Sequence, residues 1–301
     1  MTQHHIAFLG TGLMGQPMAC RLLQAGFAVT VWNRSPAKTR FCSDHGALVA
    51  TTPALAVNDA DLVITMLSDG AAVRSVVSEA LPHMKPGTLV IDMSSTRQSE
   101  ALALHAMLSN RGMECMDAPV SGGVLGAEAG TLAIMVGASA GNFDHAAAVL
   151  AVLGRPTLVG GPGAGQLAKL CNQLIVGGTL NLVAEALLLA EAGGADPAAV
   201  RSALRGGFAE SKILEVHGQR MLERNFMPGG QVSSQCKDME NILAAARDAG
   251  LQLPQAELIT GVYRRLLLTD PHADHSAALL DLERHNKGLR LGSTEDKKPG
   301  E

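Results

Sequence analysis

Short apolar runs, separated by helix-like stretches, dominate the first half of the chain. The first run, Ile6 to Gly10, leads into a group of glycines and then into a helix-like stretch from Pro17 to Ala25. Further runs of the same kind follow at residues 27–32, 62–67, 88–93, 115–117 and 133–136. Uninterrupted apolar runs are typical of strands buried on both faces of a sheet. Because helical intervals separate most of them, the pattern predicts a Rossmann-type, doubly wound α/β sheet that is mainly parallel.

The pattern changes after the Gly-Gly-Pro-Gly segment at residues 160–163. Residues 164–192 are strong helix formers with no proline among them, and the segments that follow are helical in period. This change predicts a dinucleotide-binding domain at residues 1–163 and an all-α domain at residues 164–291, opened by a long helix. The small and charged residues 292–301 are expected to form a mobile tail.

The composition supports a compact two-domain protein and argues against several partners. The chain has 301 residues, of which 47% are hydrophobic and 17% charged, so it can bury a large core. Its formal net charge of -4, without any long run of Lys or Arg, argues against a polynucleotide partner. The N-terminus shows no signal sequence, and no uninterrupted apolar run is long enough to span a membrane. A cytoplasmic location without membrane attachment is therefore expected.

The five cysteines are scattered along the chain and never form a CxxC pair. This spacing indicates neither a disulfide framework nor a zinc site, and it fits a reducing compartment. His272, Asp274 and His275 could be considered as metal ligands, but polar residues in a loop with a proline more often form a turn or a subunit contact. We therefore predict no bound metal.

A glycine-rich loop directly after the first strand predicts a dinucleotide site. Residues 10–15 satisfy the GxGxxG spacing and lie at the mouth of a predicted helix. In such a loop Gly10 permits the tight turn, Gly12 lets the backbone approach a pyrophosphate, and Gly15 lets helix and strand pack closely. A purely structural glycine turn is the alternative. The predicted cofactor-binding residues of this loop are Gly10, Thr11, Gly12, Leu13, Met14 and Gly15.

The end of the second strand favours NADP over NAD. An NAD site usually carries an acidic residue here, about 20 residues after the loop, to bind the ribose hydroxyls. This chain has Asn33 instead, followed by Arg34 and Ser35, with Lys38 a helical turn later. A cation and a hydroxyl suit the 2′-phosphate of NADP, and no carboxylate is present to repel it. A solvated strand end without a role in binding is the alternative.

Four motifs in order along the chain resemble the β-hydroxyacid dehydrogenase family, also called 3-hydroxyisobutyrate dehydrogenase-like. They are FLGTGLMGQPM at residues 8–18, DAPVSGG at 117–123, GAGQLAKLCNQLI at 163–175 and KDMENIL at 237–243. The resemblance extends to about residue 290. It implies an oxidoreductase that transfers hydride between NADPH or NADH and a small aldehyde acid or β-hydroxyacid.

The resemblance also implies roles for individual residues. Lys169 would be the catalytic residue, and Asn172 would help to hold the substrate. Gln173 flanks these two residues and is predicted to bind the substrate with them. Lys169 and Asn172 are three apart and share one face of a helix, so both can address one ligand. Residues implied to bind the substrate carboxylate are Ser121, Gly122 and Gly123. Those implied to contact the cofactor beyond the glycine loop are Met66, Leu67, Ser95 and Lys237, the last oriented by Asp238.

Within the family, residues 204–214 and 223–229 and the Asp274–Leu279 segment look most like tartronate semialdehyde reductases, also called 2-hydroxy-3-oxopropionate reductases. One feature departs from that group, because its members commonly carry Asp at the end of the second strand. The Asn33-Arg34-Ser35 segment is more similar to NADPH-using glyoxylate/succinic semialdehyde reductases. Tartronate semialdehyde reduction to glycerate is the first expectation, with 3-hydroxyisobutyrate dehydrogenase or glyoxylate/succinic semialdehyde reductase as alternatives.

Two further alternatives belong to other functional classes. An imine reductase shares the two-domain plan but generally lacks the lysine of the KxxN pair found here. A non-catalytic NADP sensor would keep the glycines without any need for Lys169, Asn172 and the Ser-Gly-Gly turn together. The long helix with its apolar surface is expected to pack against a second subunit, in a homodimer or homotetramer.

Overall fold

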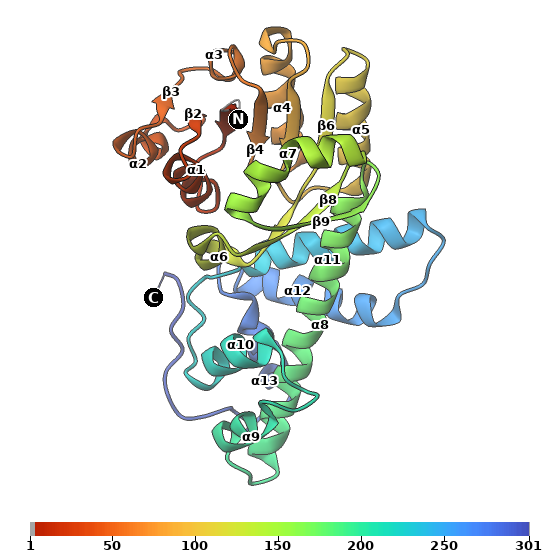
Figure 1. Ribbon diagram of the computed structural model, residues 1–301. Helices are drawn as coiled ribbons and strands as arrows, with labels where there is room; N and C mark the ends of the chain where they lie inside the picture. Colours follow the sequence, from red (N-terminus) through yellow and green to blue (C-terminus); the bar gives the residue numbers. More distant parts are fainter. Residues whose placement is uncertain (1–3, 301) are drawn as a thin grey trace. The chain divides into compact units, whose positions relative to one another are not determined.

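The computed structural model describes residues 4–300, which divide into two compact units. The N-terminal unit covers Met1–Lys169 and the C-terminal unit Leu170–Glu301. The division falls within the long helix α8 (Ala164–Ala192), six residues after the boundary expected from the sequence. Figure 1 shows a sheet flanked by helices in the first unit and helices alone in the second.

The sheet of the N-terminal unit confirms the expected Rossmann-type fold. In the described residues its strand order is β3-β2-β1-β4-β5-β6-β8-β7, with β9 paired to β8. The first six strands in this order, β3-β2-β1-β4-β5-β6, are parallel to their neighbours. Strand β8 is antiparallel to β6 and β7, and β9 is parallel to β8. The strands are β1 His5–Leu9, β2 Ala28–Trp32, β3 Leu48–Val49, β4 Leu62–Thr65, β5 Leu89–Asp92, β6 Glu114–Asp117, β7 Val120–Ser121, β8 Leu132–Gly137 and β9 Gly154–Gly160.

Three of these strands have no counterpart in the sequence prediction. Strands β3 and β7 are only two residues long, both residues of β3 are exposed, and β9 is largely exposed along its length. Their hydrogen bonds to neighbouring strands, and not a buried apolar pattern, define them. Prediction from hydrophobic runs therefore found the central strands and missed the strands at the margins.

Helices cover both faces of the sheet because successive strand residues point to opposite sides. Ile6 and Phe8 pack with buried residues of α1, α2, α6 and α7, whereas Ala7 and Leu9 pack with those of α3, α4 and α5. The helices of this unit are α1 Gly15–Gln24, η1 Pro36–Thr39, α2 Arg40–Asp44, α3 Pro53–Val57, α4 Gly70–Ala80, η2 Leu81–His83, α5 Gln98–Ser109, α6 Gly123–Ala129 and α7 Ala140–Leu153.

Helix α8, Ala164–Ala192, has the bounds expected from the sequence. Among residues 4–300 it is long and apolar enough to cross a membrane by length and composition, a criterion that core helices of globular proteins also meet. Polar residues such as Lys169 interrupt its apolar positions. Leu170, Leu180 and Leu187 on this helix are buried in the core of the C-terminal unit, so α8 serves as the central element of that unit.

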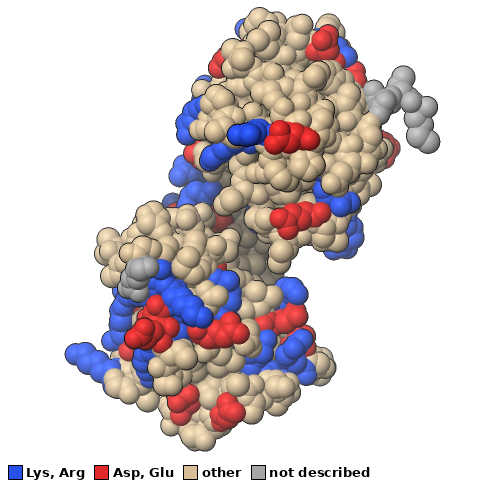
Figure 2. Space-filling view, turned by 90° about the vertical axis from the view of Figure 1, so that its left-hand side faces the viewer, with Lys and Arg blue, Asp and Glu red and all other residues tan. Residues whose placement is uncertain are grey.

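Helices pack against α8 to form the second core. This core includes Phe226, Met239 and Tyr263, all fully buried. The helices are α9 Pro197–Leu204, α10 Lys212–Leu222, α11 Val232–Asp248, α12 Pro254–Thr269, η3 His275–Ala277 and α13 Ala278–His285. Charges of both signs are interspersed on the face of the molecule shown in Figure 2, where Lys and Arg side chains lie beside Asp and Glu.

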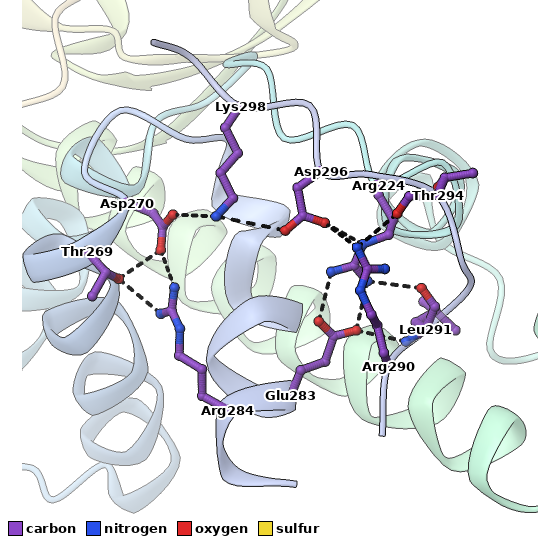
Figure 3. Close-up of polar contacts among 10 residues, drawn as sticks. All are labelled: Arg224, Thr269, Asp270, Glu283, Arg284, Arg290, Leu291, Thr294, Asp296 and Lys298. Carbon is purple, nitrogen blue, oxygen red and sulfur yellow. Dashed lines mark hydrogen bonds and ion pairs between the residues drawn. The ribbon is translucent and has the colours of Figure 1, made fainter. Parts of the chain in front are cut away.

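The C-terminal segment is tied to the helical unit by a charged network (Figure 3). The Arg224 side chain, only 1% exposed, binds both carboxylate oxygens of Glu283, the Asp296 carboxylate and the Leu291 carbonyl. Lys298 forms an ion pair with Asp270 at 3.1 Å. The expectation of a mobile tail from residue 292 did not include these contacts, because the partners lie far away in the sequence.

Candidate functional site

The glycine-rich loop connects β1 to α1, and two of its glycines are required by packing. Gly10 has a φ of 109°, and a Cβ there would collide with the backbone oxygen of Met66. A Cβ on Gly15 would collide with the backbone oxygen of Gly10. By contrast, a Cβ on Gly12 would have nothing within 4 Å. The open space lies at a helix N-terminus, where free N–H groups suit a pyrophosphate, so this loop fits a dinucleotide.

The two kinds of glycine predict two different mutant phenotypes. Gly12→Ala should leave thermal unfolding unchanged and weaken dinucleotide binding by at least about tenfold, because its methyl group would occupy space needed by the phosphates. Gly15→Ala should lower the free energy of unfolding by about 1–3 kcal/mol, because the methyl group meets backbone. Calorimetric titration with NADP and thermal unfolding separate the two effects. Equal losses of stability in both variants would contradict this distinction.

Asn33, at the end of β2, is engaged by the glycine loop. Its Oδ1 accepts a hydrogen bond from the Thr11 backbone N–H at 3.1 Å, and its Nδ2 donates to the Ser35 carbonyl. The side chain therefore holds the loop against the strand end. Arg34, Ser35 and Lys38 are exposed in the same segment. The structure thus leaves the cationic side chains directed to solvent, where a cofactor phosphate could reach them.

The loops after β4 and β5 are joined to each other and to the glycine loop. Met66 lies against Gly10, and the Leu67 backbone N–H donates to Ser94 Oγ at 2.9 Å. Thr65 Oγ1 and the Ser94 backbone N–H both donate to Oδ1 of Asp92. Burial raises the pKa of Asp92 to about 6, although these hydrogen bonds oppose the shift. The carboxyl ends of the central strands therefore form one hydrogen-bonded edge.

Gln166, in the first turn of α8, links this edge to the helix that carries Lys169. Its Oε1 accepts from the Thr96 backbone N–H at 3.0 Å, and its Nε2 donates to the Ser94 carbonyl at 2.7 Å. The two hydrogen bonds hold the backbone on both sides of Ser95, at the Ser94 carbonyl and the Thr96 N–H. Gln166 is completely buried. The Gln166 side chain thus fixes the first turn of α8, which precedes the predicted catalytic residue Lys169, to the backbone on both sides of the predicted cofactor contact Ser95.

Asp117, at the end of β6, anchors the start of α8. Its carboxylate oxygens accept hydrogen bonds from the backbone N–H groups of Gly163 and Gln166, both at 2.7 Å. Burial raises the pKa of Asp117, and the backbone hydrogen bonds counteract that effect. A carboxylate at a helix N-terminus is stabilised by free N–H groups and the helix dipole. Helix α8 therefore begins at a fixed place on the strand ends.

The Ser121-Gly122-Gly123 turn lies at the end of β7 and begins α6. Gly122 has a φ of 141° and Gly123 a φ of 63°, values in the left-handed region that favours glycine. Ser121 is half-buried and both glycines are exposed. The turn can offer backbone N–H groups to an anion, and its role in binding a carboxylate stays a prediction.

Lys169 and Asn172 lie three residues apart on α8, and both are half-buried. In the C-terminal unit, Asn172 Nδ2 donates to Gln173 Oε1 at 2.8 Å, and Gln173 Nε2 donates to Asp238 Oδ2 at 2.6 Å. The Lys237 ammonium lies 3.7 Å from the other oxygen of Asp238. The predicted residues of α8 and α11 in this unit therefore form one polar chain.

His272, Asp274 and His275, which the sequence analysis considered and did not favour as metal ligands, do not gather as a set. His272 is exposed, and His217 of α10 takes its place beside Asp274 and His275. Burial alone would raise the pKa of Asp274, but the hydrogen bond from His217 and the charge of His275 lower it. The Asp274 carboxylate also accepts from the backbone N–H groups of Gly229 and Gly230. Its visible role is to hold the 229–230 turn against η3.

Two residues important to the site received no role from the sequence. Gln166 lies inside the GAGQLAKLCNQLI motif and Asp117 begins the DAPVSGG motif, yet neither shows its partner by spacing. The available signal was an acidic residue at a buried strand end and a polar residue in a helical first turn. Their partners are 46 to 72 residues away, so only the fold reveals them.

A Rossmann sheet with this glycine loop, followed by a helix carrying a lysine and an asparagine one turn apart, defines a nicotinamide-dependent dehydrogenase. Residues 5–161 match the NAD binding domain of 6-phosphogluconate dehydrogenase. Residues 163–282 match the NAD-binding family of NADP-dependent 3-hydroxyisobutyrate dehydrogenase. The first family therefore covers the sheet domain, and the second covers the helical domain.

Individual relatives agree with the family models. The chain is 37% identical to 2-hydroxy-3-oxopropionate reductase of Escherichia coli, covering 92% of this chain and 97% of that one. It is 34% identical to NAD-dependent L-serine dehydrogenase of Pseudomonas aeruginosa, covering 87% and 92%. The structure of Mycobacterium tuberculosis 3-hydroxyisobutyrate dehydrogenase with L-serine matches with a TM-score of 0.87 and 32% identity, covering 93% and 99%. The chain belongs to the 3-hydroxyisobutyrate dehydrogenase-like family and is an NAD(P)-dependent β-hydroxyacid dehydrogenase.

Proposed function

We propose that the enzyme reduces tartronate semialdehyde to glycerate with NADPH, or catalyses the reverse oxidation. The observation that carries this proposal is the position of Lys169, one helical turn after Gln166. The Gln166 side chain is hydrogen-bonded to the backbone on both sides of Ser95. The 37% identity to 2-hydroxy-3-oxopropionate reductase favours this substrate over the alternatives in the family. Substrates of 3-hydroxyisobutyrate dehydrogenase and of glyoxylate/succinic semialdehyde reductase remain the second choice.

The proposed mechanism assigns one task to each group. The bound nicotinamide supplies the hydride. Lys169, as an ammonium, donates a proton to the carbonyl oxygen of the aldehyde, and in the reverse direction its neutral amine removes the hydroxyl proton. The Ser121-Gly122-Gly123 turn binds the carboxylate through N–H and hydroxyl donors. Asn172 holds a second polar group of the substrate from the same helix face as Lys169.

A spectrophotometric panel tests the substrate. Purified enzyme is assayed with tartronate semialdehyde, glyoxylate, succinic semialdehyde and methylmalonate semialdehyde, each with NADH and NADPH, together with the corresponding alcohols. The highest kcat/KM is expected for tartronate semialdehyde. Cyclic imines are included, since their reduction in place of aldehyde acids would favour an imine reductase. Oxidation of NADPH by any aldehyde acid would exclude a non-catalytic sensor.

The preference for NADPH rests on the exposed Arg34, Ser35 and Lys38 beside an Asn33 that is already bonded to Thr11 and Ser35. Arg34→Ala is expected to raise the KM for NADPH about tenfold, because a charge-assisted bond to the 2′-phosphate is lost. The KM for NADH should stay the same, since NADH has no such phosphate. Arg40→Ala, an exposed arginine on α2 nearby in the sequence, serves as the control. An equal change for both cofactors would contradict the preference.

A homodimer or homotetramer is proposed from the exposed side of α8. Ile175, Leu182 and Leu189 recur every seven residues on one helix face and are 65–73% exposed. A regular apolar stripe of this kind suits burial against a second copy of the chain. Sedimentation of the wild type and of Leu182→Glu tests the assembly, and a wild type that sediments as a monomer would exclude it.

We also propose that the enzyme works in the cytoplasm, which fits its free cysteines.

A further inference from the structure

The N-terminal unit contains a cavity of about 310 Å³ between helices α4 and α5, a size typical of small-molecule sites. Its apolar wall includes Val73 of α4 and Leu104 and Met107 of α5. Ala103 also lines the cavity and is exposed, so the cavity opens to solvent between the two helices. None of its lining residues was predicted to bind the cofactor or the substrate. The cavity is therefore separate, in its residues, from the site described above.

Two buried polar side chains line this cavity. Asp92, at the end of β5, is 1% exposed, and Thr96, in the loop that follows, is 4% exposed. Among residues 4–300, neither Oδ2 of Asp92 nor Oγ1 of Thr96 has a hydrogen-bond partner. A buried polar atom without a partner costs free energy, and both of these atoms are able to accept a hydrogen bond. A ligand that donates to both oxygens would remove this cost.

The charges around the cavity favour a cation as the donor. Burial raises the pKa of Asp92 to about 6, so at pH 8 the carboxyl is ionised and only accepts hydrogen bonds. The carboxylate of Glu100 also lines the cavity and is held by the Arg97 backbone N–H at 2.8 Å. Arg74 contributes a positive charge to the lining, but it is exposed, and solvent screens it. Two carboxylates therefore outweigh one exposed guanidinium.

We propose that this cavity is a second binding site, which takes a small primary amine with an apolar body. The ammonium group donates hydrogen bonds to Oδ2 of Asp92 and Oγ1 of Thr96, and the apolar part packs against the wall formed by α4 and α5. A ligand with a carboxylate in place of the amine is repelled by Asp92. The proposal is independent of the aldehyde acid that the enzyme reduces.

The proposed amine site is linked to the predicted cofactor-binding loops through Asp92. Oδ1 of the same carboxylate accepts from Thr65 Oγ1 at 2.8 Å and from the Ser94 backbone N–H at 3.0 Å. Ser94 Oγ in turn accepts from the backbone N–H of Leu67, a predicted cofactor contact. An amine bound at Oδ2 is therefore expected to change the affinity for NADP by at least about fivefold, and NADP must change the affinity for the amine by the same factor.

Calorimetric titration at pH 8 with three probes of similar shape tests the site. The probes are 2-phenylethylamine, 2-phenylethanol and phenylacetate, each titrated with and without NADP. The amine is expected to bind at least about tenfold more tightly than the alcohol, because it adds a charge-assisted hydrogen bond. Phenylacetate is expected to show no binding in this cavity.

Two variants place the binding in the cavity. Asp92→Asn keeps an oxygen for Thr65 and Ser94 but replaces Oδ2 by a donor, so it should weaken amine binding by at least about tenfold and leave the alcohol nearly unaffected. Ala103→Trp should abolish amine binding by filling the cavity. Ala106→Trp is the matched control, because Ala106 is exposed on the same helix and does not line the cavity.

Equal binding of the three probes overturns the proposal. So does an amine affinity that is unchanged in Asp92→Asn or in Ala103→Trp, since the amine would then bind elsewhere. A loss in Ala106→Trp as large as that in Ala103→Trp also counts against the site, because it would reflect a disturbed α5 and not a filled cavity. Equal amine affinities with and without NADP overturn the link to the cofactor-binding loops.

Discussion

Lys169→Ala is expected to lower kcat by about a hundredfold to ten-thousandfold, the contribution usually made by a positioned general acid. The reason is that the aldehyde oxygen gains a proton as it gains the hydride, and no other amine is placed one turn after Gln166 on α8. Because the side chain acts on the reacting oxygen, kcat and kcat/KM should fall together. Stopped-flow and steady-state assays with tartronate semialdehyde and NADPH measure both.

Dinucleotide binding should be nearly intact in the same variant. The glycine loop and the loops after β4 and β5 make their contacts with one another without the Lys169 side chain. Calorimetric titration with NADPH checks this point, and Lys287→Ala, at an exposed position after α13, provides the control for loss of a lysine. Turnover equal to that of the wild type would refute the assignment of Lys169 as the catalytic residue.

Arg224→Met is expected to lower the free energy of unfolding of the helical unit by about 3–5 kcal/mol, because it leaves carboxylates without their buried partner. The guanidinium binds Glu283 through two nitrogens and reaches Asp296 at 2.5 Å (Figure 3). Its pKa is raised because these acceptors outweigh the effect of burial. Removing it should also release residues 292–300, which thermal unfolding and limited proteolysis would report.

The matched control for this variant is Arg264→Met. Arg264 also forms a two-nitrogen bond to a carboxylate, that of Glu240, but the pair is 58% and 39% exposed. Exposed pairs contribute about 0–1 kcal/mol, so this change should have little effect. If both variants unfolded at the same temperature as the wild type, the Arg224 network would not stabilise the C-terminal segment.

The apolar pattern predicted the central strands and α8 well, because a strand buried on both faces needs a run of apolar residues whatever its neighbours are. It missed β3, β7 and β9, whose positions depend on pairing to strands already present. The GxGxxG loop was found from its spacing, since Gly10 and Gly15 meet local packing demands and Gly12 leaves the space that a pyrophosphate needs. The roles of Asp117 and Gln166 were not found, because their partners are distant in the sequence.

The sequence alone therefore determined the class of protein. Local rules decide which residues form the central strands, the long helix α8 and the glycine-rich turn, and the family motifs predicted the role of Lys169. Only the tertiary structure decided how these parts are held: Asp117 at the start of α8, Gln166 around Ser95, Asp238 on Gln173 and Arg224 on the C-terminal segment. The physical reason is that a hydrogen bond or ion pair depends on atoms within about 3 Å, and the fold sets that distance.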